Sequence, residues 1–214
     1  MEKINFPYLY ALQDKVLQAV FTRETSFYLT GGTCLHRFFY EFRYSADLDL
    51  FTSANNTFHE DVRDVKECLE KVSLDYEPIV ESRDFVRLKI ENKLQVDLVN
   101  DRVYRLGRSQ KNSQGIRIDN IENICANKIC AVLGRDDPKD VFDIYVIYSQ
   151  SNIEWPEIVK ATRKKCALDP EILEFRLNSF PLDLLKYLNV LNKKTIDQME
   201  QNYSITIKNI LDYF

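Results

Sequence analysis

Glycine and proline are scarce in this sequence of 214 residues, which contains five glycines and six prolines. Disordered and fibrous chains are usually much richer in these residues, so both classes are disfavoured. Hydrophobic residues make up 45% of the sequence and charged residues 29%, which is the balance of a folded, helix-rich globular protein. The length suits one domain or two small ones.

The sequence also lacks the signals of export, membrane insertion and cysteine-based structure. No apolar run is long enough to span a bilayer, and the N-terminal segment lacks the basic flank and apolar stretch of a signal peptide. Its five cysteines form no CxxC motif and are not paired with histidine, so neither a zinc site nor a disulfide framework is indicated. We therefore expect a cytoplasmic protein. The net charge of −4 argues against broad adhesion to nucleic acid or membrane, although a local basic groove is compatible with it.

The first half of the chain mixes helix and strand patterns. Strict alternation predicts a β-hairpin from residues 84–91 and 93–100, joined at Asn92-Lys93. Thr57 and Glu60 form a capping pair that predicts a helix to about residue 73. The other expected elements are a helix from Pro7, a strand at 26–30 before Gly31-Gly32, a helix at 33–42 and a strand at 44–51.

The second half has purely helical patterns. Asp119 and Glu122 predict the cap of a helix that runs to about Leu133 and is closed by Gly134. Further helix starts are expected at Asp137-Pro138, Trp155-Pro156, Asp169-Pro170, Pro181 and Thr195. We therefore expect an α+β protein, with an α/β domain over residues 1–115. A helical domain over residues 116–214 is expected to complete the active-site cleft.

The stretch YSADLDLF places two carboxylates in an apolar strand pattern. Asp47 and Asp49 share one face of a strand, while Leu48 and Leu50 take the other. Carboxylates side by side repel, and a divalent ion such as Mg²⁺, which prefers hard oxygen ligands, relieves that repulsion. The alternative is a solvated strand end with two unrelated acids.

Other residues fit a phosphate and metal site. The pair Gly31-Gly32 lies between a strand and a helix, where backbone N–H groups can approach a phosphate, although a tight turn is the simpler reading. Asp97 interrupts the apolar run KLQVDLVN, either as a third metal ligand or as a salt-bridged edge residue. Lys128 occupies the apolar stripe of its helix and could reach a phosphate or snorkel to solvent.

The order of these motifs resembles that of DNA polymerase β-like nucleotidyltransferases, and the fuller pattern is similar to the AbiEii-type family of nucleotidyltransferase toxins. The segment GGTCLHRFFYEFRYSADLDLF carries GGT-x-L and R-x-S-x-DLD, matched at Arg43, Ser45, Asp47 and Asp49. The segment KICAVLGRDDPKDVFDIY matches the family's later motif at Lys128, Arg135, Asp140 and Asp143, and Lys139 stands where the family has arginine.

This resemblance implies a nucleotidyltransferase-type mixed sheet flanked by helices, followed by a helical bundle. It implies transfer of a nucleoside monophosphate from an NTP to RNA (tRNA included) or protein, by a toxin encoded beside an antitoxin. Asp47, Asp49 and Asp97 are expected to hold one or two Mg²⁺ ions, with Mn²⁺ as an alternative. The expected nucleotide ligands are Gly31, Gly32, Thr33, Ser45, Lys128 and Arg135. Asp140 and Asp143 are expected to orient Lys128, contact the nucleotide or fix the helical half, although they could merely cap and decorate a surface.

Two rival functions remain at this point. DLDLFT partly matches the DxDxT motif of haloacid dehalogenase-type phosphatases, but RYSA before it is polar and Thr52 falls one position too late. The other rival is an inactive nucleotidyltransferase fold that only binds a nucleotide or a partner. Two short basic segments could follow an RNA backbone or be ordinary solvated surface: Arg102, Arg105, Arg108 and Lys111, and Arg163, Lys164 and Lys165.

Overall fold

The computed structural model of the protein describes residues 4–53 and 55–214. These residues form two compact units. The first contains residues up to Cys34, Ser45–Arg102 and Ser109–Asp119, and the second contains Leu35–Tyr44, Val103–Arg108 and Asn120–Phe214. The chain therefore passes between the units several times, and each unit is described by itself.

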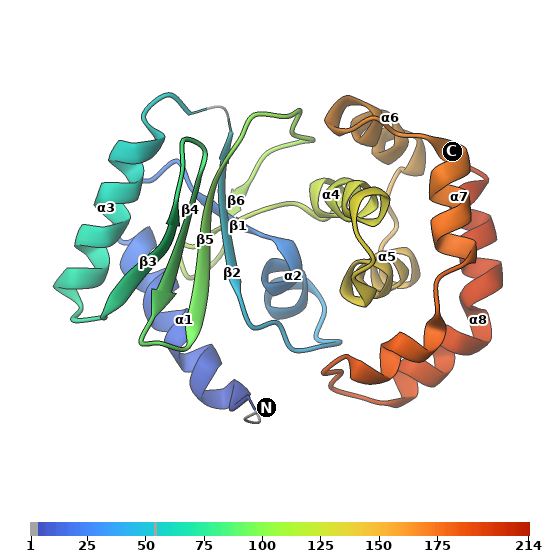
Figure 1. The fold of residues 1–214 in the computed structure, drawn as a ribbon, viewed down its shortest axis with the longest axis horizontal. Coiled ribbons are helices and arrows are strands. Elements are labelled where there is room, and N and C mark those ends of the chain that lie inside the picture. The colour runs from blue at the N-terminus through green and yellow to red at the C-terminus, as the bar shows by residue number, and fades with distance from the viewer. Residues whose placement is uncertain (1–3, 54) are drawn as a thin grey trace. The chain divides into compact units, whose positions relative to one another are not determined.

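The first unit is built on a seven-stranded mixed sheet with the order β3-β4-β5-β2-β1-β7-β6 (Figure 1). β2 pairs with β5, and β1 with β7, in parallel, whereas the other neighbours are antiparallel. The strands are β1 (Tyr28–Thr30), β2 (Leu48–Ser53), β3 (Tyr76–Glu81), β4 (Phe85–Ile90), β5 (Leu94–Asp101), β6 (Gln110–Lys111) and β7 (Arg117–Ile118).

The predicted hairpin is confirmed as β4 and β5, but its turn lies one residue earlier than expected. Glu91 and Asn92 both have positive φ, at 50° and 54°, and the Lys93 N–H donates to the Ile90 carbonyl at 2.9 Å. Positive φ at both central positions matches the twist of the strands that the turn connects. The turn therefore sets a register in which Arg87 lies opposite Asp97.

Two helices, α1 (Phe6–Phe21) and α3 (Phe58–Lys71), pack against each other and cover one face of this sheet (Figure 1). The alternation expected for β2 is confirmed, because Leu48 and Leu50 are fully buried while Asp49 and Phe51 are half-buried. The apolar face of β2 forms the core, so its acidic face points the other way.

Three expectations about helix ends and helix type were wrong. The Thr57 hydroxyl donates to the Asn55 side chain at 2.8 Å instead of capping α3. In place of the helix expected at 33–42, the chain forms a short helix, α2 (Gly31–Cys34), which continues as a π-helical turn, Leu35–Phe39. Asn120, rather than Asp119, caps the next helix, since Asp119 is buried and accepts a hydrogen bond from the Thr30 hydroxyl at 2.7 Å.

The second unit is mainly helical. The expected helix starts at Asp137-Pro138 and Asp169-Pro170 are confirmed, and each aspartate caps its helix by accepting backbone N–H bonds. Gly134 is the last residue of its helix, and the helix ends because the backbone of Arg135 is extended. The expectation that Gly134 caps the helix was therefore wrong. The helices are α4 (Ile121–Gly134), α5 (Pro138–Gln150), α6 (Trp155–Lys165), α7 (Pro170–Asn178) and α8 (Lys194–Leu211), with a 3₁₀ turn at Leu182–Tyr187.

A contiguous apolar core lies where α4 packs against α5 and α6. Ile124, Cys125 and Ile129 of α4 are buried there together with Phe142 and Ile158. None of the described helices is long and apolar enough to cross a membrane. The expected α+β fold class, with a mixed sheet flanked by helices and a helical C-terminal part, is confirmed.

Candidate active site

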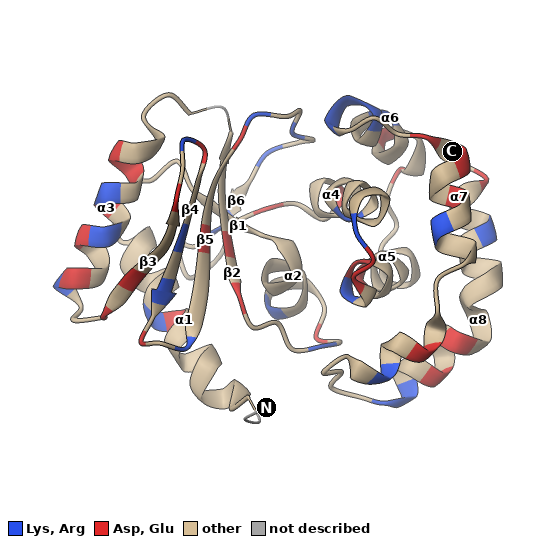
Figure 2. Cartoon of the chain, in the orientation of Figure 1, with Lys and Arg blue, Asp and Glu red and all other residues tan. Residues whose placement is uncertain are grey.

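A row of polar side chains crosses the sheet of the first unit. In the strand register, Arg87 of β4 lies opposite Asp97 of β5, and Asp97 lies beside Asp49 of β2. Asp49 in turn lies opposite Thr30 of β1. Residues in direct register project from the same face of a sheet, with Cβ atoms about 4.5–5.5 Å apart in antiparallel pairs. Figure 2 shows acidic positions on β2 and β5 beside basic positions on β4. Strand pairing therefore aligns Asp49 and Asp97, which lie far apart in the sequence.

Arg87 is the immediate partner of Asp97. Its Nε and Nη2 atoms each donate to one carboxylate oxygen of Asp97 at 2.7 Å, and the Gln95 amide donates to the same group at 3.2 Å. The hydrogen bonds to Asp97 raise the pKa of Arg87 most, and the charges of Asp47 and Asp49 raise it further. The three predicted aspartates thus act on one guanidinium, of which 35% of the side chain is exposed.

Gly31 is required by the carboxylate of Asp49. It has a φ of +69°, and a Cβ atom at this position would lie 2.2 Å from Oδ2 of Asp49. The same segment of the chain is tied to the residue just before β2, because the buried Thr33 hydroxyl donates to the backbone carbonyl of Asp47. The missing side chain of Gly31 therefore has a structural reason within the protein, whether or not a phosphate binds.

Ser45 is held through its backbone. Its N–H donates to the Tyr10 hydroxyl at 3.1 Å, and its carbonyl accepts from the Gln13 amide at 3.0 Å. Both partners belong to α1, and Gln13 is fully buried. These bonds fix the segment that leads into Asp47.

The donor set partly fits a divalent cation. Asp47, Asp49 and Asp97 offer hard carboxylate oxygens, and two of them are in register on adjacent strands. However, within residues 4–53 and 55–214 no group of three His, Cys, Asp or Glu side chains is arranged to hold a metal ion. The reason at Asp97 is visible, since Arg87 engages both of its oxygens. The carboxylates fit such an ion in donor type and register, and Arg87 supplies the positive charge at Asp97 in this arrangement.

The predicted residues of the second unit form a buried network of charges around Asp143. Arg43 donates from Nε and Nη2 to the two oxygens of Asp143, at 2.8 and 2.7 Å. The Lys128 ammonium lies 2.7 Å from Oδ2 of Asp143 and 2.8 Å from Oδ1 of Asp140. Arg135 completes the network by donating to both oxygens of Asp140, at 2.7 and 3.1 Å.

Burial and charge determine the ionisation of this network. Asp140 and Asp143 have no exposed surface, so the alternative of surface decoration was wrong. Burial by itself raises the pKa of Asp143, but the charges of Arg43 and Lys128 and a hydrogen bond from His36 outweigh it and lower that pKa well below its usual range. Burial lowers the pKa of Lys128, but Asp143 and Asp140 outweigh it and raise that pKa. Lys128 is therefore held as a cation by two carboxylates rather than snorkelling to solvent.

His36 is a member of the network that the sequence did not indicate. Its Nε2 lies 2.8 Å from Oδ1 of Asp143, and its Nδ1 lies 3.0 Å from the Tyr40 carbonyl. Both partners are acceptors, so the two hydrogen bonds exist together only when both ring nitrogens carry protons. Arg43 was indicated by family resemblance alone. Arg87 could have been found from the hairpin register, had the loop been placed at residues 91–93, which sets Ile90 opposite Leu94 and Arg87 opposite Asp97.

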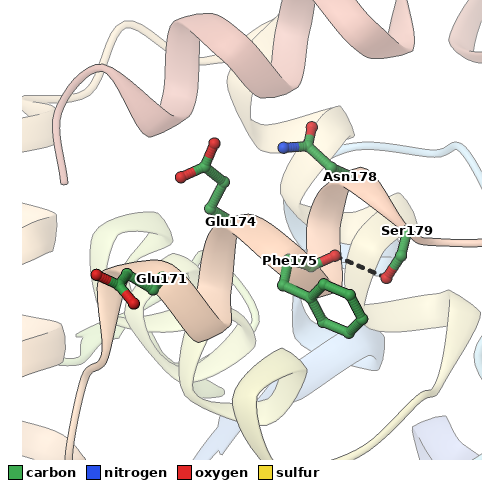
Figure 3. Close-up of a pocket in the computed structure, with 5 residues that line it drawn as sticks. All are labelled: Glu171, Glu174, Phe175, Asn178 and Ser179. Carbon is green, nitrogen blue, oxygen red and sulfur yellow. Dashed lines mark hydrogen bonds between the residues drawn. The ribbon is translucent and has the colours of Figure 1, made fainter.

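A hollow on α7 lies outside this set of residues. It is lined by Glu171, Glu174, Phe175, Asn178 and Ser179, and the Ser179 hydroxyl donates to the Phe175 carbonyl (Figure 3). Four of these residues belong to α7 and Ser179 directly follows it, and the predicted site residues lie elsewhere in the sequence.

The network predicts a loss of stability in Asp143→Asn. Removing one partner of a buried ion pair leaves the others uncompensated, so the free energy of unfolding should fall by about 3–5 kcal/mol at neutral pH. The pKa of Asp143 is lower in the folded protein, so its contribution is present above about pH 4 and is lost as the pH falls further. Urea denaturation should therefore show a difference between wild type and variant that shrinks below pH 4.

The matched control is Asp136→Asn, because Asp136 is an exposed carboxylate that pairs with Arg176. This control should change the free energy of unfolding by less than about 1 kcal/mol. Equal stability of wild type and Asp143→Asn at neutral pH would contradict the prediction.

Comparisons with known proteins identify the fold. The fold is similar to that of MenT4, a nucleotidyltransferase toxin from Mycobacterium tuberculosis, with a TM-score of 0.63, 14% identity, and coverage of 98% of this chain and 88% of that one. It is also similar to JHP933 from Helicobacter pylori, with a TM-score of 0.58, 17% identity, and coverage of 98% and 95%. At these identities the likeness establishes the fold alone. A search of curated protein sequences finds no match.

A family model gives the more direct result. The model described as "Nucleotidyl transferase AbiEii toxin, Type IV TA system" matches residues 15–211, which is most of the chain. A match of this extent implies a nucleotide substrate and an antitoxin partner. The chain therefore belongs to the AbiEii nucleotidyltransferase toxin family of type IV toxin–antitoxin systems, and it is a nucleotidyltransferase.

Proposed function

We propose that this protein transfers a nucleoside monophosphate from an NTP to a hydroxyl group of RNA, with a divalent cation at the aspartates of the sheet. The observation that carries the proposal is the row of Arg87, Asp97 and Asp49 in register across the sheet. Grouping carboxylates costs free energy, because the charges repel and lose solvation. A protein that only binds a partner does not need such a cluster, whereas a catalytic cation site does. We further propose that it acts in the cytoplasm.

Asp47, Asp49 and Asp97 are the residues that we assign to the cation, either Mg²⁺ or Mn²⁺. When bound, such an ion polarises phosphoryl oxygens and neutralises charge that develops on the leaving group. Asp97 has a second assigned role, which is to accept the proton of the attacking hydroxyl. For either role its carboxylate has to exchange its hydrogen bonds to Arg87 for new partners. We therefore assign Arg87 the role of a positioning residue.

Gly31, Gly32 and Thr33 are assigned to the triphosphate, with Ser45 close in sequence to the aspartates. Support comes from the bond between Thr33 and the backbone of Asp47, and from the fit of Gly31 against Asp49. These contacts tie the glycine turn to the segment that carries Asp47 and Asp49.

Lys128 is assigned to a phosphate oxygen. An ammonium group has three N–H donors, and Asp140 and Asp143 engage two of them. Two carboxylates hold the group in one position, so a phosphate contact through the third donor would need little reordering. Asp140 and Asp143 are then positioning residues for Lys128. Arg135 donates to both oxygens of Asp140, which supports the same role for it more than direct nucleotide binding.

RNA is favoured over protein as the acceptor by a basic surface on the second unit. The Lys164 ammonium lies 4.4 Å from the centre of the exposed Tyr104 ring, so residues of two predicted basic segments meet. Arg108 and Arg163 are exposed in the same two segments. Basic side chains around an exposed aromatic ring are typical of surfaces that bind single-stranded nucleic acid.

The first of the two predicted basic segments, which runs from Arg102 to Lys111, is only partly available to bind RNA. Arg102 and Lys111 belong to the first unit, where Arg102 pairs with Asp84 at 2.8 Å and Lys111 with Glu24 at 2.7 Å. The residues that we assign to RNA are therefore Tyr104, Arg108, Arg163 and Lys164.

The first test is to incubate the protein with each α-labelled NTP, Mg²⁺ or Mn²⁺, and total cellular RNA. We expect one RNA class to be labelled, and Asp47→Ala and Asp49→Ala to lower labelling by about 10²–10³-fold or more. Both variants should melt at or above the wild-type temperature without metal, because the repulsion between carboxylates is reduced. Asp75→Ala, which removes an exposed aspartate of the same unit, is the control and should remain active.

Each other outcome of this test has a defined meaning. Label on protein alone would overturn RNA as the acceptor but retain nucleotidyl transfer. Binding of NTP without labelling of any acceptor would favour the alternative of an inactive nucleotide- or partner-binding protein. Wild-type activity in either alanine variant would remove that residue from the cation site.

The pairing of Arg87 with Asp97 predicts opposite effects of two substitutions on cation binding. Asp97→Asn should weaken Mn²⁺ binding and lower transfer by about 10²-fold or more, while NTP still binds. Arg87→Met removes the cation that competes for Asp97, so Mn²⁺ should bind about tenfold more tightly. Electron paramagnetic resonance of free Mn²⁺ measures both affinities without NTP. Equal affinities in both variants and wild type would return Asp97 to a purely structural role.

Lys128→Met should weaken NTP binding at least tenfold, measured by calorimetry. It should also lower the free energy of unfolding by about 3–5 kcal/mol, because Asp140 and Asp143 each lose a buried partner. The control is Lys160→Met, since Lys160 is an exposed lysine of α6. NTP affinity equal to that of wild type, in a variant that is still folded, would make Lys128 a structural residue only.

A further inference from the structure

Two of the five cysteines lie in contact in the second unit. Cys130 belongs to α4, and Cys166 directly follows the last residue of α6. Their sulfur atoms are 2.7 Å apart, although 35 residues separate them in the sequence. The packing of α4 against α6 therefore creates a thiol pair that the spacing of cysteines in the sequence did not indicate.

The geometry of this pair is close to that of a covalent bond. A disulfide holds its sulfur atoms about 2.05 Å apart, so these atoms need to approach by only a fraction of an ångström. Both residues are half-buried, so a small oxidant can reach them. Cys34, Cys68 and Cys125, in contrast, are buried, and burial raises the pKa of the Cys34 and Cys125 thiols. A raised pKa disfavours the reactive thiolate, so oxidation should be selective for the pair.

We propose that Cys130 and Cys166 are a reversible oxidation site, at which a peroxide converts the two thiols into an intramolecular disulfide. One thiol loses its proton, and its thiolate attacks a peroxide oxygen and breaks the O–O bond, which gives a sulfenic acid and a hydroxide that takes up the released proton as water. The second thiol attacks the sulfenic sulfur, forms the S–S bond and releases a second molecule of water. Two thiols and one hydrogen peroxide thus give one disulfide and two waters, and a dithiol reductant reverses the change.

The bond would staple α4 to the end of α6. It closes a loop of the chain that includes α5, so it restricts the unfolded chain and should stabilise the second unit. Lys128 lies two residues before Cys130 on α4, so the staple forms on the helix that carries the buried charge network. The proposal stands on the thiol contact and is independent of the proposed nucleotidyl transfer.

The test treats the reduced, folded protein with hydrogen peroxide and maps the products by mass spectrometry. We expect a mass loss of two hydrogen atoms, one cross-link between the peptides that contain Cys130 and Cys166, and a fall from five titratable thiols to three. Dithiothreitol should restore all five. Amide hydrogen exchange in α4 should slow and the melting temperature should rise by several degrees after oxidation.

Single serine variants distinguish disulfide formation between Cys130 and Cys166 from non-specific oxidation of the other cysteines. Cys130→Ser and Cys166→Ser should show no cross-link and no rise in melting temperature, whereas Cys68→Ser should keep both responses. The proposal is overturned if the folded wild type keeps five thiols at peroxide concentrations that oxidise free glutathione. A cross-link to another cysteine, or oxidation of a single cysteine to sulfinic acid, would also overturn it. These wild-type results decide the matter even if a serine variant does not fold.

Discussion

The second unit depends on a carboxylate that has no contact with solvent. Asp143 remains ionised in the interior only because Arg43 and Lys128 surround it and His36 bonds to it. These groups come from three segments of the chain, namely residues 35–44, α4 and α5. An isolated buried charge would be strongly unfavourable, so the three segments have to meet for any of them to be stable. The position of Lys128 is a consequence of this requirement.

The first unit is organised by hydrogen bonding between strands rather than by a buried charge. The parallel pairing of β2 with β5 places Leu48 beside Val96 in the core, and the same register places Asp49 beside Asp97 on the opposite face. A slip of one residue would exchange the two faces, so the apolar core enforces the alignment of the carboxylates. Arg87 then balances this row of negative charge from the neighbouring strand.

Local rules predicted most of the elements well. Proline at a first helical position and an aspartate cap located α5 and α7, and alternation located β4 and β5. The errors arose where a capping residue had a better partner elsewhere. Asp119 is engaged by the hydroxyl of Thr30, and the short strands β6 and β7 have too few residues for a periodic pattern. At Asp119 a contact distant in sequence outweighed the local capping preference.

The sequence by itself determined the acidic face of YSADLDLF, the lysine on its apolar helical stripe, and the order of motifs that places the chain in its family. Only the tertiary structure decided which side chains meet. Arg87 meets Asp97, His36 meets Asp143, and Cys130 meets Cys166. The physical reason is that alternation and helical periodicity determine only the face of the strand or helix on which a side chain lies. The residue opposite it is set by strand register and helix packing, which depend on contacts between distant segments.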